Sequence, residues 1–87
     1  GNNSKELNFM NFTNLRELQI WKCKEITTIK ISGSPQLSNL VLFHNEHLRT
    51  LELKDLPNLE TVDVRNCVLH MSPWRKIEKL PNLNNLQ

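Results

Sequence analysis

The sequence predicts a β-rich solenoid, in which short strands stack in register to form parallel sheets. Three observations predict it: an apolar spacing that recurs every 11 residues, an alternation of period two inside each copy, and only two glycines among 87 residues. Tight β-hairpins need glycine at their turns, so a hairpin-rich protein is disfavoured. A unit of two short strands cannot bury its apolar row alone, and stacking units about 4.8 Å apart provides the missing cover.

The recurring spacing follows the pattern LxxLxLxx(C/N/S/L)xx, which begins at Leu15 and occurs five times without a gap. All fifteen of its L positions hold Leu, Ile or Val. Because the x-L-x-L core alternates, it indicates a strand and excludes an amphipathic helix. The ninth position differs between odd and even copies, so two 11-residue halves form one 22-residue unit. We therefore expect an N-terminal flank or cap over 1–14 and a solenoid over 15–87, with units starting at 15, 37 and 59 and a partial unit at 83.

The ninth position of the odd copies holds Cys23, Asn45 and Cys67. We expect these residues to turn the chain out of the strand and to point inward, as a structural ladder. An asparagine there can bond backbone groups of neighbouring turns, and a cysteine packs as a small, weakly polar substitute. Two coils separate the cysteines, so their Cα atoms should lie about 9.5–10 Å apart, beyond the roughly 7 Å limit for a disulfide. We therefore predict two free, buried thiols.

The last unit is longer than the others and predicts one short helix near the C-terminus. Ser72 suits the N-cap, Pro73 suits the first helical position, and Pro81 ends the run. The apolar face of this helix, which we expect to pack on the core, consists of Trp74, Ile77 and Leu80. Partial exposure of Trp74 for a partner is the alternative.

The repeat resembles a known family. The segments LRELQIWKC, LSNLVLFHN and LETVDVRNC match the leucine-rich repeat consensus LxxLxLxx(N/C), and ITTIKISGSPQL and LRTLELKDLPNL resemble the nested half-repeat of a bacterial surface subgroup. The resemblance covers Leu15 to Leu86. It implies a right-handed leucine-rich repeat solenoid with a parallel sheet on the concave side, second short strands opposite, and a secreted or cell-surface location. A cytosolic, immune-receptor-like repeat array from a eukaryote is the alternative context.

Composition and motifs exclude several classes of function. The net charge of +2, from 11 basic and 9 acidic residues, gives no reason to expect a nucleic-acid partner. No apolar run approaches the roughly 18 residues that a membrane span needs. There is no Gly-rich phosphate loop, GxSxG or HExxH motif, and no CxxC or HxxxH spacing for a metal. We therefore expect neither an enzyme nor a cofactor.

The outward positions of the odd half-repeats predict a binding surface. Trp21 and Phe43 should be neighbours on an open sheet, with Arg65 next in line. Tryptophan and arginine dominate binding hot spots, and an exposed aromatic cluster usually marks an interface. The even half-repeats carry an ordinary solvated face, with Lys30 opposite Glu52. The partner-binding candidates are Gln19, Trp21, Val41, Phe43, Asp63 and Arg65.

These observations leave three uses for the aromatic cluster. It binds an external protein or glycan, it mediates assembly of a homo-oligomer, or it is cross-strand packing covered by the flanking segment Leu7–Phe12. The leading hypothesis is a non-enzymatic binding module. The alternative is a structural fragment of a longer solenoid, which self-associates through an open edge at 83–87 or through the aromatic cluster.

Overall fold

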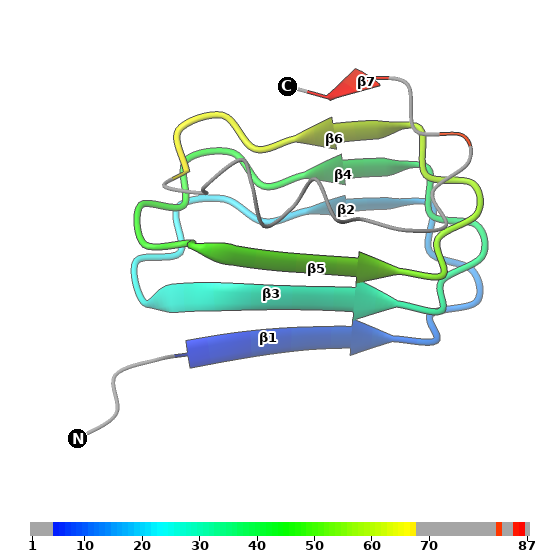
Figure 1. The fold of residues 1–87 in the computed structure, drawn as a ribbon, viewed down its shortest axis with the longest axis horizontal. Coiled ribbons are helices and arrows are strands. Elements are labelled where there is room, and N and C mark those ends of the chain that lie inside the picture. Colours follow the sequence, from blue (N-terminus) through cyan, green and yellow to red (C-terminus); the bar gives the residue numbers. More distant parts are fainter. Residues whose placement is uncertain (1–4, 68–81, 83–84, 87) are drawn as a thin grey trace.

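A computed structural model describes residues 5–67, 82 and 85–86 of the chain, and these residues form two parallel β-sheets (Figure 1). The three-stranded sheet contains β1 (Lys5–Met10), β3 (Ile26–Ser32) and β5 (Thr50–Lys54). The four-stranded sheet contains β2 (Glu17–Gln19), β4 (Asn39–Val41), β6 (Thr61–Asp63) and β7 (Asn85–Leu86). The protein is therefore β-rich, and the expected helix after Ser72 lies outside the described residues.

From β1 to β6 successive strands alternate between the two sheets, β7 then pairs with β6, and strands of different sheets run in opposite directions (Figure 1). In the four-stranded sheet Leu18 pairs with Leu40, and Leu40 pairs with Val62. In the other sheet Ile29 pairs with Leu51. Paired residues of β2 and β4, of β4 and β6, and of β3 and β5 are thus 22 positions apart, which is the predicted register. The last pairing, Val62 with Leu86, is 24 positions apart and matches the longer final unit.

The core lies between the two sheets, because the period-two alternation directs every second side chain of each strand inward. In β5, for example, Leu51 and Leu53 are 5 % exposed while their neighbours are exposed to solvent. The buried apolar residues are Ile20, Ile29, Ile31, Leu37, Leu40, Leu42, Leu48, Leu51, Leu53, Leu56, Leu59 and Val62. All but Leu56 occupy L positions of the repeat pattern.

The segment predicted as a flank contributes a strand of its own. β1 pairs in parallel with β3, which places Leu7 beside Ile29 and Phe9 beside Ile31. Leu7 and Phe9 both pack against the core. Their spacing to Phe12 repeats the pattern of the later half-repeats, so the stacked strands begin before Leu15.

A left-handed backbone residue recurs at every eleventh position, a feature that the sequence analysis did not anticipate. Its φ values lie between 53° and 61°. Glycine, asparagine and aspartate tolerate this conformation best, and Lys22 is the member least suited to it. Each left-handed residue directly precedes an inward-pointing turn residue and lies one to three positions beyond the end of a strand. The six are Asn11, Lys22, Gly33, His44, Asp55 and Asn66.

Candidate interaction surface on the four-stranded sheet

Three side chains form a stacked column just beyond the ends of β2, β4 and β6. The ring centroids of Trp21 and Phe43 are 5.3 Å apart at an interplanar angle of 60°, an edge-to-face contact. The guanidinium carbon of Arg65 lies 5.6 Å from the centroid of Phe43 on its other side, within cation–π range. The column is therefore ordered from end to end, and Trp21, 52 % exposed, is its open end.

The backbone holds this column in line because the sheet bonding continues past the strand ends. The Ile20 amide donates to the Val41 carbonyl at 2.8 Å, and the Leu42 amide donates to the Asp63 carbonyl at 2.7 Å. The left-handed residues that follow, Lys22 and His44, then turn the chain away. Equivalent residues of successive strands thus stay in register as far as the rings.

Asp63 fixes the orientation of Arg65. The guanidinium donates from Nε to Oδ1 at 3.0 Å and from Nη2 to Oδ2 at 2.8 Å, and the Arg65 amide donates to Oδ1 at 3.1 Å. These bonds lower the pKa of the Asp63 carboxyl, chiefly through the side-chain bond, and raise the pKa of Arg65. The guanidinium charge is therefore paired within the chain while it stays within cation–π distance of Phe43.

A polar network occupies the opposite end of the same sheet face. Glu17 accepts hydrogen bonds from the Gln19 amide at 2.9 Å and from the Asn39 amide at 2.6 Å. The Asn39 Oδ1 atom is covered and has no hydrogen-bond partner among the described residues. Half-buried Val41 lies between exposed Gln19 and half-buried Asp63 in the middle column of the face. The structure thus brings all six predicted binding residues onto one surface.

The flanking segment does not cover the aromatic column. One alternative has the segment Leu7–Phe12 covering Trp21 and Phe43. This segment instead forms β1 and the turn after it, on the three-stranded sheet. Leu7 and Phe9 face the core from that side. That alternative is wrong, because parallel pairing with β3 places the segment on the other side of the core.

The outer face of the three-stranded sheet is a charge ladder. Lys30 lies 3.3 Å from a Glu6 carboxylate oxygen and 3.7 Å from one of Glu52. Hydrogen bonds from Asn8 and Lys30 lower the pKa of Glu6, and the bond to Glu6 together with the charge of Glu52 raises the pKa of Lys30. The predicted opposition of Lys30 and Glu52 is present, and this face carries charged side chains where the other sheet carries the aromatic rings.

Asn45 is the fully buried centre of the predicted ladder. Its Nδ2 donates to the carbonyls of Leu42 at 2.7 Å and Ile20 at 2.9 Å, and its Oδ1 accepts from the Cys23 amide at 3.0 Å. The Cys67 thiol repeats one of these contacts, since it donates to the Leu42 carbonyl at 2.8 Å. The ladder therefore ties successive strand ends together.

Cys23 and Cys67 are both free thiols, but they are half-buried rather than buried as predicted. Among the described residues, Cys23 belongs to the first turn of its column. Desolvation raises the pKa of the Cys67 thiol. A raised pKa keeps a thiol protonated at neutral pH and argues against a nucleophilic role.

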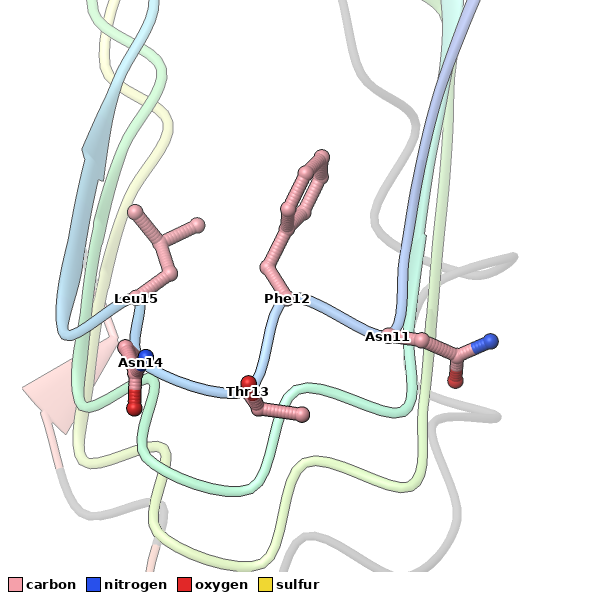
Figure 2. Close-up of a pocket in the computed structure, with 5 residues that line it drawn as sticks. All are labelled: Asn11, Phe12, Thr13, Asn14 and Leu15. Atoms are coloured by element: carbon pink, nitrogen blue, oxygen red, sulfur yellow. The ribbon is translucent and has the colours of Figure 1, made fainter.

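Within the described residues no group of three or more His, Cys, Asp or Glu side chains could hold a metal ion. A hollow lies at the turn after β1, where Asn11, Phe12, Thr13, Asn14 and Leu15 line it (Figure 2). It contains no titratable group and belongs to the end of the stack, away from the aromatic column.

Among the residues described by the structure, no helix is long and apolar enough to cross a membrane. Comparisons of the chain with protein-family models, with curated proteins and with solved structures gave no significant match.

Proposed function

We propose that this chain is a non-enzymatic binding module that recognises a protein partner through its aromatic face, defined as Gln19, Trp21, Val41, Phe43, Asp63 and Arg65. The observation that carries the proposal is the half-exposed Trp21 at the open end of an ordered stack. Burial of a large aromatic ring is favourable, so a partner that covers Trp21 gains the free energy of that burial.

The aromatic face is organised before any partner arrives. Asp63 and Phe43 hold Arg65, and Phe43 in turn supports Trp21, so few rotamers remain to be fixed on binding. A preorganised face loses less conformational entropy on association. Because Asp63 already pairs the guanidinium, the face favours apolar and stacking contacts over capture of an anion.

We further propose that the architecture is a leucine-rich repeat solenoid of the bacterial secreted or cell-surface type. The 22-residue strand register, the left-handed residue at every eleventh position and the buried Asn45 support this assignment. The proposed location follows from the resemblance of the repeats and is tested by the sequence that precedes residue 1 in the encoding gene.

Binding is tested with peptides selected from a displayed library on the wild-type chain, followed by affinity measurement on a Trp21→Ser/Phe43→Thr variant. Truncation of hot-spot residues costs about 2 kcal/mol or more, so we expect at least a roughly thirtyfold loss of affinity. The matched control is Met10→Ser, which removes an exposed apolar side chain, 58 % accessible, from the other sheet. This control should bind as the wild type does.

Circular dichroism and thermal melting of the double variant complete the experiment. Retained fold with lost binding supports the proposal. An unfolded double variant identifies the rings as structural, and unchanged affinity places the binding surface elsewhere; either result overturns the proposal. Selective binding to an array of glycans, with no peptide selected, reassigns the partner class.

A further inference from the structure

The turn after β1 carries a three-residue motif that the function proposed above does not use. Asn11, Phe12 and Thr13 match Asn-x-Ser/Thr, the acceptor motif for N-linked sugars, in which x is not proline. A match this short indicates a sugar site only where the asparagine amide is accessible and the hydroxyl residue has no role in holding the turn.

Thr13 breaks the repeat at the residue that completes the motif. The equivalent positions of the later copies all hold proline, namely Pro35, Pro57 and, in the longer last unit, Pro81. Proline restricts the unfolded chain and so stabilises a turn that can accept it. A proline at residue 13 would also abolish the motif, because its third residue must carry a hydroxyl. The first copy thus lacks a favourable turn residue and has the motif in its place.

The hydroxyl of Thr13 does not hold the turn together. Its side chain is exposed and makes no hydrogen bond to any residue that the structure describes. Other groups tie this turn to the next one: the Asn11 amide donates to the Ser32 carbonyl at 3.0 Å. The Phe12 amide donates to the Ser34 hydroxyl at 3.3 Å. The turn therefore gives no structural reason for a threonine at this position.

The side-chain amide of Asn11 is accessible. Figure 2 shows this side chain directed away from the space between the two sheets, into which Phe12 points. Asn11 is exposed, and its side-chain amide forms no hydrogen bond within the part of the chain that the structure describes. Its oxygen lies against Gly33, where a Cβ would collide with it. One side of the amide thus rests on the neighbouring turn, and Nδ2 is left for solvent.

This accessibility is a property of the turn rather than of its place in the chain. Pro35, which has a described turn on either side of it, is exposed in the same way as Thr13. Asp55, which occupies the place of Asn11 in a later turn, is exposed as well. Further turns stacked before β1 would therefore leave the side chains of residues 11 and 13 in solvent.

We propose that Asn11 is an acceptor site for an N-linked sugar. In the transfer, Nδ2 bonds to the anomeric carbon of a diphosphate-activated sugar. The bond between that carbon and the diphosphate oxygen breaks, the diphosphate leaves, and one amide proton is lost. The Thr13 hydroxyl is the group that the transferring enzyme recognises. The donor carries its sugar on a nucleotide or on a lipid, and a single hexose on the product indicates the first, whereas a whole oligosaccharide indicates the second.

The sugar lies at the other end of the strands from the aromatic column. β1 ends at the turn of Asn11, whereas β2, β4 and β6 run in the opposite direction and end at the column (Figure 1). The aromatic face therefore stays open when the sugar is present. N-linked sugars are carried by surface loops of secreted proteins, so this inference rests on the proposed location but not on the proposed binding. A failed peptide-binding experiment leaves it untouched.

Peptide mapping of the protein isolated from its native source is the decisive test. Trypsin cleaves after Lys5 and Arg16 and releases the peptide 6–16. This peptide contains Asn11 and excludes Asn2, which begins a second Asn-x-Ser match outside the described residues. Fragmentation by electron transfer keeps a sugar on its side chain, and we expect it on Asn11 and on neither of the other two asparagines of the peptide. An unmodified peptide 6–16 overturns the proposal, whether or not Asn2 carries a sugar.

Variants secreted from a eukaryotic cell that adds N-linked sugars identify the residues that the transfer needs. All are made in an Asn2→Gln background, so that residue 11 is the acceptor under test. Thr13→Pro restores the proline of the repeat, and it should lose the sugar completely, as should Asn11→Gln. Thr13→Ser and Asn14→Gln keep the motif, and these matched controls should carry as much sugar as the parent chain.

Circular dichroism of each variant checks that the fold is retained, and Thr13→Ala takes the place of Thr13→Pro if the proline variant does not fold. Loss of the sugar from the motif variants, with full modification of both controls, supports the proposal. A parent chain secreted without a sugar on residue 11, a Thr13→Pro or Thr13→Ala chain that still carries one, or an unmodified Thr13→Ser chain overturns it.

Discussion

The strands are joined by turns at their two ends, and the inward-pointing residues of these turns form two columns, whose contrast is sharpest between Asn45 and Leu56. One column holds Cys23, Asn45 and Cys67 and the other holds Phe12, Ser34 and Leu56. Both columns follow a left-handed residue, and in both the carbonyl of the inward residue accepts a hydrogen bond from three residues later, as at Asn45 and Leu56. The backbone turn is therefore the same, and only the inward-pointing side chain differs.

The backbone groups around each turn decide which inward side chain suits it. At Asn45 the carbonyls of Ile20 and Leu42 and the amide of Cys23 all point inward, and one amide side chain satisfies the three. At Leu56 an apolar side chain is fully buried instead. Buried backbone groups need partners, so Asn45 and Leu56 are not interchangeable even though their turns are alike.

Exchanging the inward side chains of the two turns, at Asn45 and Leu56, gives the largest expected loss in the free energy of unfolding. Asn45→Leu removes the partners of the Ile20 carbonyl and the Cys23 amide and leaves the Leu42 carbonyl with the Cys67 thiol alone, and we expect it to lower the free energy of unfolding by about 2–3 kcal/mol. Leu56→Asn buries an amide among apolar side chains and should cost about 2–4 kcal/mol. Chemical denaturation of each single variant measures both values.

Asn45→Asp and Leu56→Met are the controls for this exchange. Leu56→Met keeps volume and polarity, and it should cost less than about 1.5 kcal/mol. Asp cannot donate the two Nδ2 bonds, so Asn45→Asp should resemble Asn45→Leu. If Asn45→Leu is tolerated, the hydrogen bonds of this column contribute little and the contrast between the two columns has no energetic basis.

Substitutions at the left-handed positions give the next largest change in the free energy of unfolding. We expect opposite signs at Gly33 and Lys22. Gly33→Ala forces a Cβ against the Asn11 side chain at a φ of 61°, and we expect a loss of about 1–2 kcal/mol. Lys22→Gly relieves a non-glycine residue at a φ of 53° and should stabilise the fold by about 0.5–1 kcal/mol. Thermal melting of both variants tests the series.

Asn11→Gly in the Gly33→Ala background separates the two causes at this turn, because glycine tolerates the left-handed φ of residue 11. Removing the Asn11 amide removes the clash but leaves the strained φ, so only part of the stability should return. Equal signs for Gly33→Ala and Lys22→Gly would contradict a shared left-handed turn.

The smallest effect concerns the thiol of the polar column. Because desolvation raises the pKa of Cys67, its thiolate forms at higher pH in the folded chain than in the unfolded one. In a Cys23→Ser variant, the rate of alkylation of Cys67 should rise with a midpoint above that of the same chain in denaturant. A midpoint at or below the denatured value would show that the thiol is not desolvated.

Several features of the fold could be predicted because they repeat in the sequence. The period of 22 residues places Leu18, Leu40 and Val62 in one column, and the structure pairs them in that register. The same count aligned Trp21 with Phe43 and Arg65. Parallel in-register pairing converts a constant spacing into a constant column, so these neighbours require no knowledge of the rest of the molecule.

Other features of the fold could not be predicted, because they depend on which residues a local backbone conformation tolerates or on contacts with distant parts of the chain. The strand of Lys5–Met10 was missed since its copy of the pattern uses phenylalanine at Phe9 and Phe12 in place of aliphatic residues. The left-handed series was missed because Lys22 and His44 interrupt a run otherwise made of glycine, asparagine and aspartate. The recurrence of glycine, asparagine or aspartate at most of these positions, eleven residues apart, was the signal that could have indicated the turns.

The sequence by itself determined which residues stack on which, since the spacing of apolar positions sets the register. Only the tertiary structure decided which of those residues remain exposed. Leu18 and Leu40 occupy the same position of the repeat, yet one is half-buried and the other fully buried. Burial depends on whether another layer lies beyond a residue, and that is a property of its place in the stack.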